Sequence, residues 1–426
     1  MRGLQRFTLF FCLLAPILVA ATHGGGDNGG DFWVDGPAEV QPGVDRNIPD
    51  AGIDKFGRSI YVWYAFGSEG GNRNDVFLRR FDAAGEPLKD PVMVNTSTED
   101  DQFFARVAVS EDGSFLVVWQ SDEPDSEVNV DRKFVRSQAF DANANPVGSE
   151  LLVNTLLTGE AVDISADVAA LKGGGYVVVW RSRKSAGDDD WLGIQARLIS
   201  ANGAALGAQF QANSLVGKSE NYPAVTGLAD GGFLVVWTTP EVHGRKFEAD
   251  GTAVGDDFQI NTFTTGTEAE TDVVRGFGDQ VLVVWKDSEE NVEETEIRGR
   301  FFNQNLAAQG SDFRINTFTA GAQNHVKAGD YGSGGFFVVW QSVGSTGNDA
   351  DAQSIQGRIV TGSDQFRGAQ FQLNAWITGA QQFPGIGGRG GKIAVAWRSP
   401  GNVETDKVVI VGQIWSLCGI YCDGFE

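Results

Sequence analysis

Residues 230–237 of the chain read Asp-Gly-Gly-Phe-Leu-Val-Val-Trp, and this stretch decides the fold. A glycine-rich turn leads into a short apolar run with β-branched residues, and the run ends in tryptophan. The pattern occurs seven times, with tryptophans 48 to 61 residues apart, and a repeat of this length indicates a propeller blade or a similar unit. The tryptophans are Trp63, Trp119, Trp180, Trp237, Trp285, Trp340 and Trp397.

Two further landmarks accompany the tryptophans. Upstream of six of them, an apolar segment ends in asparagine; these are Asn95, Asn154, Asn213, Asn261, Asn316 and Asn374. Downstream of each tryptophan stands an arginine or a glutamine; these are Arg79, Gln138, Arg197, Arg245, Arg300, Arg358 and Gln413. Each unit therefore has four expected strands: one before the glycine turn, the tryptophan run, one with the arginine or glutamine, and one that ends in asparagine.

The tryptophan run lacks polar alternation, which is typical of a strand buried on both faces. Four-stranded units stacked around an axis make a propeller, whereas the coils of a linear β-solenoid are shorter and its ends need caps. We therefore predict an all-β fold, a seven-bladed β-propeller of four-stranded antiparallel blades. The last unit lacks a fourth strand, so the N-terminal strand, at residues 36–41, is expected to close the ring.

The N-terminus has the features of a signal peptide, because Arg2 and Arg6 precede an apolar run and Ala21 offers a cleavage site. We expect a signal peptide at 1–21, a flexible glycine-rich leader at 22–35, the propeller at 36–415 and a C-terminal tail at 416–426. The mature protein is expected to have no transmembrane segment and to be secreted, periplasmic or on the cell surface. A disulfide between Cys418 and Cys422 is expected in an exported chain.

The seven units resemble the Gly-Gly-Phe-Val-Val-Val-Trp repeats of large exported bacterial proteins, which are expected to form propellers. The resemblance covers roughly residues 36–415 and implies the fold, but it implies no activity, because propellers host both enzymes and binding modules. Residues 418–426 resemble short C-terminal tails that end near Asp-Gly-Phe-Glu on exported proteins of Gram-negative bacteria. That second resemblance implies a role in export or surface sorting.

A formal net charge of −23 disfavours nucleic acid and anionic membranes as partners. Much of the acid falls in the connections between the second and third strands of the units, and six of these seven connections are long. Clustered carboxylates suit Ca²⁺, whereas the alternative is an ordinary solvated acidic loop. The candidate Ca²⁺ ligands are Asp188, Asp189, Asp190, Asn348, Asp349 and Asp351.

Trp191 and Trp376 stand outside the repeat and are candidates for contact with carbohydrate or peptide, although each can equally cap its own loop. The repeated arginine or glutamine and the repeated tryptophan are interpreted as structural. No motif for a nucleophile, a catalytic metal or a phosphate loop occurs, so no catalytic residue is assigned. The sequence predicts a monomeric, secreted or cell-surface module that binds a protein or glycan through its acidic loops. The alternatives are a glycan-active hydrolase or lyase that uses loop carboxylates, and a structural or adhesive surface protein.

Overall fold

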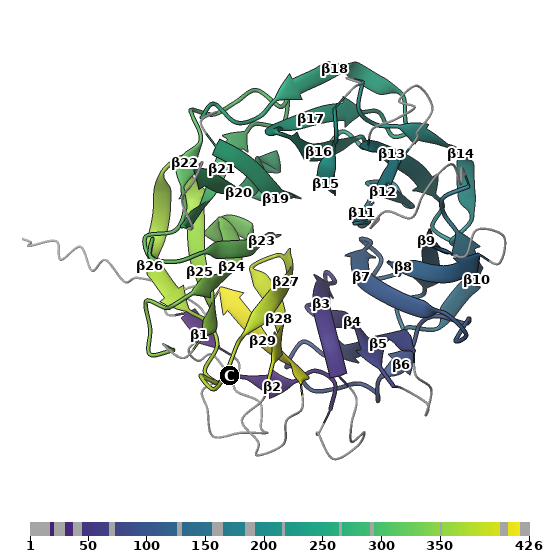
Figure 1. Ribbon diagram of the computed structural model, residues 1–426, viewed down its shortest axis with the longest axis horizontal. Helices are drawn as coiled ribbons and strands as arrows, with labels where there is room; N and C mark the ends of the chain where they lie inside the picture. The colour runs from purple at the N-terminus through teal and green to yellow at the C-terminus, as the bar shows by residue number, and fades with distance from the viewer. Residues whose placement is uncertain are drawn as a thin grey trace, which may run out of the picture.

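Seven antiparallel sheets surround a central axis, so the chain folds as the predicted seven-bladed β-propeller (Figure 1). The computed structural model describes residues 18–20, 30–36, 45–67, 73–125, 130–155, 165–183, 192–214, 218–263, 266–289, 294–349, 352–400 and 408–417. Within these ranges, no helix has the length and apolar character needed to cross a membrane.

The strands of each blade are called A to D, from the axis outward (Figure 1). Strands A are β3 (Asp45–Ile53), β7 (Asp101–Val109), β11 (Asp167–Ala170), β15 (Asn221–Gly227), β19 (Gly266–Arg275), β23 (Gln323–Asp330) and β27 (Gln382–Arg389). Strands B are β4 (Ser59–Phe66), β8 (Phe115–Asp125), β12 (Tyr176–Arg183), β16 (Phe233–Thr239), β20 (Val281–Glu289), β24 (Phe336–Val343) and β28 (Lys392–Ser399). Strands C are β5 (Asn74–Phe81), β9 (Val130–Phe140), β13 (Leu192–Ile199), β17 (Glu241–Phe247), β21 (Thr295–Phe302), β25 (Gln353–Gly362) and β29 (Val409–Leu417). Strands D of the first six blades are β6 (Val92–Met93), β10 (Pro146–Leu152), β14 (Ala205–Gln211), β18 (Ala253–Gln259), β22 (Phe313–Arg314) and β26 (Gln365–Gln372).

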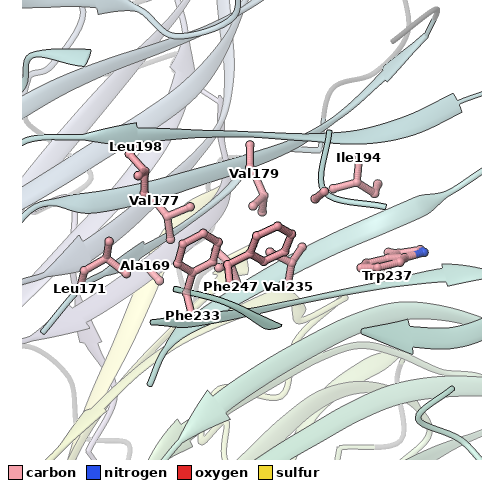
Figure 2. Packing of buried hydrophobic residues seen from close by; sticks show 13 residues of the cluster. Ala169, Leu171, Val177, Val179, Ile194, Leu198, Phe233, Val235, Trp237 and Phe247 are labelled. Carbon is pink, nitrogen blue, oxygen red and sulfur yellow. The ribbon is translucent and has the colours of Figure 1, made fainter. Parts of the chain in front are cut away.

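Strand B of each blade is buried on both faces, as predicted. In β12, Val177 and Val179 pack toward the fourth blade, whereas Val178 packs toward the second. Figure 2 shows the first two valines in one cluster with Phe233 and Val235 of β16. All seven repeat tryptophans are at most 2% exposed, which confirms their structural interpretation. The run lacks alternation because each of its residues has a neighbouring blade to pack against.

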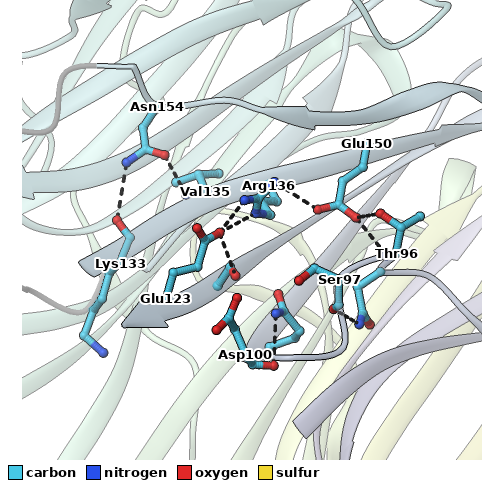
Figure 3. Close-up of polar contacts among 12 residues, drawn as sticks. Thr96, Ser97, Asp100, Glu123, Lys133, Val135, Arg136, Glu150 and Asn154 are labelled. Carbon is cyan, nitrogen blue, oxygen red and sulfur yellow. Dashed lines mark hydrogen bonds and ion pairs between the residues drawn. The ribbon is translucent and has the colours of Figure 1, made fainter. Parts of the chain in front are cut away.

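The recurring asparagine ties strand D to strand C. In six blades its side-chain oxygen accepts a backbone N–H of strand C at 2.7 to 3.1 Å, as Asn154 does from Val135 (Figure 3). The residue after the asparagine bonds to the next blade, and Thr96 N–H donates to Glu150 Oε2 over 2.8 Å (Figure 3). Five further junctions repeat this inter-blade bond, with the acceptors Gln209, Asp257, Asp312, Gln370 and Asp31.

The recurring arginine is also structural, as predicted. Arg197 Nη1 donates to Val153 O in the preceding blade over 2.8 Å, while its Nε donates to Gly207 O over 3.2 Å. Equivalent donors to the segment before strand A are Arg79, Arg245, Arg300, Arg358 and Gln413. In six blades, one long polar side chain therefore satisfies a carbonyl group at the junction with the preceding blade, whereas Gln138 donates to Ala139 O and Val147 O within its own blade.

The ring closes through the N-terminal segment, as predicted, but through earlier residues than 36–41. Strand β2 (Phe32–Trp33) pairs with β29, and Val34 N–H donates to Ile410 O over 2.9 Å. Gly36 lies outside any strand, and residues 37–41 are not among those described. Strand β1 (Leu18–Ala20) also pairs with β29, but it lies in the predicted signal peptide and would leave with it.

Packing explains why the closing strand lies there. Phe32 and Val34 are 7% and 0% exposed, and the Phe32 ring lies 5.1 Å from Phe81 of the first blade. Residues 32–35 read Phe-Trp-Val-Asp and match the Phe-x-Ile-Asn pattern of the D segments, with aspartate in place of asparagine. Residues 30–35, predicted as part of a flexible leader, are therefore the seventh copy of the D segment.

Two buried carboxyls mark this closing segment. Asp31 Oδ2 accepts the N–H groups of Ala375 and Trp376 at 3.0 Å each, and Asp35 forms an ion pair of 2.5 Å with Arg46. Burial raises the pKa of Asp31 and the pKa of Asp35 to about 6, although their hydrogen bonds and the Arg46 charge favour the ionised forms. Closure of the ring therefore places two proton-binding groups at the seam.

Candidate functional site

Each A strand starts with the same backbone irregularity, on the face of the propeller that carries the D–A and B–C connections. We call this face the loop face. In six blades the A–B pairing skips two residues, and the first of them has φ between 42° and 55°. Ser165, two residues before β11, has the same conformation in the third blade. The seven residues, which we call the mouth ring, are Ile48, Phe104, Ser165, Tyr222, Glu270, His325 and Phe383.

This conformation is unusual for every member of the mouth ring. A positive φ is disfavoured for residues other than glycine, above all for β-branched and bulky ones. The residue after each ring member is buried, and it is proline at Pro49, Pro223 and Pro384. Each ring side chain itself is half-buried or exposed. The bulge therefore anchors one residue between blades and leaves its predecessor accessible, and strain of this kind tends to cluster at functional sites.

The mouth ring surrounds a cavity of about 530 Å³ at the loop-face end of the central channel. All seven members line this cavity, so every blade contributes one side chain. Phe104, Tyr222 and Phe383 provide aromatic faces, and Tyr222 is 42% exposed. Strand positions hold side chains more rigidly than loops do, which makes the cavity a pre-formed candidate site.

A second layer of charged side chains lies two residues beyond the mouth ring, and we call it the inner layer. Its members are Asp50, Arg106, Asp167, Asp272 and Lys327. Each of the three carboxylates accepts a backbone N–H of the next blade. The donors are Val107 at 3.0 Å, Val225 at 2.9 Å and Ala328 at 2.8 Å. The carboxylates of the inner layer therefore join the first blade to the second, the third to the fourth and the fifth to the sixth.

The two cations of the inner layer differ in their partners. Lys327 Nζ lies 3.3 Å from Asp272 Oδ1. Arg106 Nη1 donates to Ala105 O over 3.0 Å, and the guanidinium has no ion pair with any residue that the structure describes. Arg106 consequently keeps unused N–H donors at the cavity.

Burial, together with the neighbouring charges, shifts the pKa values of the inner layer. Burial raises the pKa of Asp167 to about 6, against the favourable charge of Lys327, and burial also raises the pKa of Asp50. Burial acts against the Lys327 ammonium as well, but the Asp272 and Asp167 carboxylates hold its pKa above the ordinary value. Asp167 is therefore a cavity carboxyl that exchanges its proton near neutral pH.

His325 lies between a carboxylate and an aromatic ring. Its Nδ1 is 3.9 Å from Glu270 Oε2, and its ring centroid is 4.6 Å from that of Phe383. Lys286 Nζ lies 3.1 Å from the other Glu270 oxygen. Burial lowers the pKa of His325 even though Glu270 favours the charged form, so the imidazole is neutral near pH 7.

A second cavity of about 530 Å³ lies at the opposite end of the channel. Its cations are engaged by the backbone: Lys172 Nζ donates to Ala229 O over 2.7 Å, and Arg275 Nε donates to Gly227 O over 2.9 Å. The loop-face cavity is the stronger candidate because it combines the aromatic members of the mouth ring with a cation that has donors to spare.

Most of the residues that were predicted from sequence cannot be placed against this cavity. Seven of them lie outside the described residues, so the calcium, ligand and disulfide predictions that rest on them stay predictions. They are Asp188, Asp189, Asp190, Trp191, Asp351, Cys418 and Cys422. In the part of the chain that is described, no three His, Cys, Asp or Glu side chains are grouped so as to hold a metal ion.

Of the remaining predicted residues, Asp349 and Trp376 are buried and Asn348 is exposed. Asp349 is 2% exposed, and its Oδ2 accepts Asn374 Nδ2 over 2.7 Å. Asn348 Oδ1 accepts Gln372 Nε2 over 3.2 Å. Trp376 is 3% exposed and its ring lies 6.0 Å from that of Trp33, so it packs on the closing segment.

The sequence prediction missed the mouth ring, although a signal for it exists. Six of its members stand fifteen residues before the tryptophan of their blade, as Tyr222 does before Trp237, and the seventh stands fourteen before. The position changes between aromatic, acidic, basic and hydroxyl side chains. Divergence at one fixed position of an otherwise regular repeat is what a ligand site would show, so the position is a candidate.

No family model matches the chain, and no curated protein matches its sequence. Among solved structures, a protein of unknown function from Dyadobacter fermentans DSM 18053 aligns with a TM-score of 0.52 and 11% identity, over 92% of this chain and 99% of that one. The polysaccharide lyase Uly1 aligns with a TM-score of 0.47 and 12% identity, over 85% of this chain and 88% of that one. Penicillium chrysogenum α-L-arabinanase aligns with a TM-score of 0.44 and 14% identity, over 78% and 98%. At 11% identity, the alignment with a TM-score of 0.52 concerns the fold alone and assigns no activity.

Proposed function

We propose that this protein is an exported module that binds a glycan at the mouth ring. The observation that carries the proposal is the ring itself, seven residues of different chemistry in the same strained conformation around one cavity. The long acidic connections predicted from sequence start on this same face and would flank a ligand that extends beyond the cavity.

The chemistry of the cavity favours a saccharide. A sugar presents apolar ring faces and many hydroxyl groups, and the mouth ring offers the aromatic faces of Phe104, Tyr222 and Phe383 beside the polar groups of Ser165 and Glu270. The volume of about 530 Å³ lies within the usual range of ligand sites, about 300–1,000 Å³. Peptide binding is the competing outcome of the experiment below.

Replacement of Tyr222 by alanine is expected to weaken glycan binding about tenfold, equivalent to about 1.4 kcal/mol. Tyr222 is the most exposed aromatic residue of the mouth ring, and its loss removes a stacking face without opening the core. The ligand is first identified by screening the purified protein on an oligosaccharide array. Affinities are then measured by calorimetry for the wild type and for Tyr222→Ala and Phe104→Ala.

The matched control is Phe277→Ala, because Phe277 is 66% exposed and lines the opposite cavity. Its affinity for the glycan should equal that of the wild type. Unchanged affinity in both mouth-ring variants, or an equal loss in Phe277→Ala, would contradict a glycan site at the mouth ring.

A glycan-active hydrolase or lyase at the same mouth is a second candidate. It is favoured by Asp167, whose pKa burial raises to about 6, and by the neutral imidazole of His325. General acids and bases work best when their pKa lies near the operating pH. Against it, Asp50 and Asp167 both accept backbone N–H groups of neighbouring blades and so serve the structure.

The two candidates differ in turnover. If the protein is an enzyme, Asp167→Asn or His325→Ala should lower the release of reducing ends or unsaturated sugars from a polysaccharide panel about a hundredfold or more. Both variants should keep their affinity for the glycan. No product from the wild type, on a glycan that calorimetry shows to bind, would eliminate the enzymatic candidate and leave the binding module.

A further inference from the structure

The inner layer narrows the class of glycan that suits the cavity. We infer that the mouth binds an acidic glycan and that Arg106 holds its carboxylate or sulfate group, with Lys327 beside it. This inference rests on the proposed function and adds to it the charge of the ligand and the side chain that recognises that charge.

Arg106 has the geometry and the freedom that such a group requires. It lies on β7 and lines the loop-face cavity. Its guanidinium makes one hydrogen bond, to the carbonyl of the adjacent Ala105, and no ion pair with the described residues. The planar fork of an arginine matches the two oxygens of a carboxylate or sulfate, and a charge-assisted pair of this kind is stronger than a neutral hydrogen bond.

The carboxylates of the cavity form no ion pair with Arg106, although its charge favours the ionised form of Asp50, and each carboxylate has a hydrogen-bond donor of its own. Asp50 and Asp167 accept N–H groups of adjacent blades, at 3.0 and 2.9 Å. Glu270 accepts Lys286 and the backbone N–H of His325. Of the cations in the inner layer, Arg106 is therefore the one with no ion pair among the described residues, and its unused N–H donors are available to a ligand.

Lys327 strengthens the case. Lys327 Nζ lies 3.3 Å from Asp272 Oδ1. The charge of Arg106 acts to lower the pKa of the Lys327 ammonium, which indicates that the two cations lie close enough to interact. At Lys327 the Asp272 and Asp167 carboxylates outweigh the repulsion by Arg106, so it is Arg106 that a bound anion would stabilise. This arrangement stands out in a protein whose formal net charge is −23.

The choice of a glycan rather than an acidic peptide follows from the rim. The group bound by Arg106 would sit below Phe104, Tyr222 and Phe383, which are suited to stack on the sugar rings that carry it. A carboxylate and a sulfate both offer the guanidinium a pair of anionic oxygens, so the experiment must distinguish a carboxylated glycan from a sulfated one.

The test uses the full mature chain and four probes: tetragalacturonate, its methyl ester, a carrageenan tetrasaccharide and maltotetraose. Tetragalacturonate, which carries carboxylates, and the carrageenan tetrasaccharide, which carries sulfates, are expected to bind. The one that binds more tightly identifies the acid group that the cavity prefers. The methyl ester and maltotetraose should bind at least about tenfold more weakly. Binding of the acidic probe should weaken as sodium chloride rises, because salt screens the charges.

Arg106→Gln should reduce affinity for the acidic probe about thirtyfold, and Arg106→Lys should recover part of it, since the charge returns without the fork. Every inter-blade hydrogen bond should be kept, because the one hydrogen bond of Arg106 runs to its own neighbour, and the melting temperature checks whether loss of the charge near Asp50 affects folding. The matched control is Arg73→Gln, which removes the same charge from a side chain that is 50% exposed on the loop face. Its affinity should stay within about twofold of the wild type.

The outcomes separate the inference from the proposed function. Equal binding of tetragalacturonate and its ester by the wild type, or full affinity in Arg106→Gln, would overturn the acidic-glycan inference and leave glycan binding in place. Capture of acidic peptides by the wild type, with no oligosaccharide bound, would overturn both.

Discussion

Deletion of residues 30–36 is expected to lower the melting temperature by roughly 10 °C or more and to cause self-association. These residues close the ring, and Phe32 and Val34 are 7% and 0% exposed. Loss of a buried phenylalanine alone costs about 3–5 kcal/mol. The deletion also removes the Asp31 acceptor from the N–H groups of Ala375 and Trp376.

Self-association follows from the edge that the deletion exposes. Strand β29 would lose its pairing with β2, and an unpaired strand edge is a template for a strand of another molecule. Melting is measured by calorimetry and association by size-exclusion chromatography with light scattering. The control is an equally long deletion of residues 22–28 in the predicted leader, which should change neither quantity. A 30–36 deletion that stays monomeric with an unchanged melting temperature would show that the ring is held closed elsewhere.

The fold could be predicted because the residue types in each repeat directly reflect which strands are buried. In β12, Val177 and Val178 face different blades, so a middle strand has no polar side and its apolar run is visible in the sequence. The turn before each run is also visible in the sequence, because its backbone conformation requires glycine. Gly231, at φ 98°, adopts a conformation that other residues avoid.

The closing segment was misplaced because one substitution and a glycine-rich context hide its pattern. Asp35 stands where the other D segments have asparagine, and the residues before Asp31 are rich in glycine and read as a leader. What marks the segment in the structure is tertiary packing, since Phe32 contacts Phe81 of the first blade. The closing strand itself is two residues long, too short to show a periodicity.

The mouth ring could not be predicted from strand patterns for a different reason. A bulge inserts an extra residue and interrupts the alternation on which strand prediction depends. Glu270 and His325 look like ordinary polar residues at a strand end, but each has a positive φ and precedes a buried residue, Thr271 or Val326. Sequence reasoning placed function on the acidic connections, whereas the structure places the candidate cavity on the strands themselves.

The melting temperature is expected to rise as the pH falls from about 7.5 to about 5, and Asp31→Asn should remove part of that rise. The pKa of Asp31 in the folded protein is about 6, above its ordinary value of 3.8. The folded state therefore binds the proton more tightly than the unfolded state. The resulting stability is complete below about pH 3.8 and is lost as the pH rises through about 6, a difference of about 3 kcal/mol.

An amide is chemically suited to this position, because Gln209 and Gln370 accept the equivalent inter-blade N–H bond in two other blades, each at 2.7 Å. The control is Asp250→Asn in an exposed C–D turn, where hydrogen bonds to Thr252 hold the pKa of the carboxyl below its ordinary value. Above about pH 6 both variants remove one negative charge from a chain of net charge −23, so in that range they relieve the overall repulsion alike. The buried carboxyl at the seam then accounts for any difference in pH slope between them, measured by calorimetry at matched ionic strength. If the melting temperatures of Asp31→Asn and Asp250→Asn change in parallel with pH from about 5 to about 7.5, Asp31 is ionised throughout this range. Closure of the ring would then not respond to pH through this group.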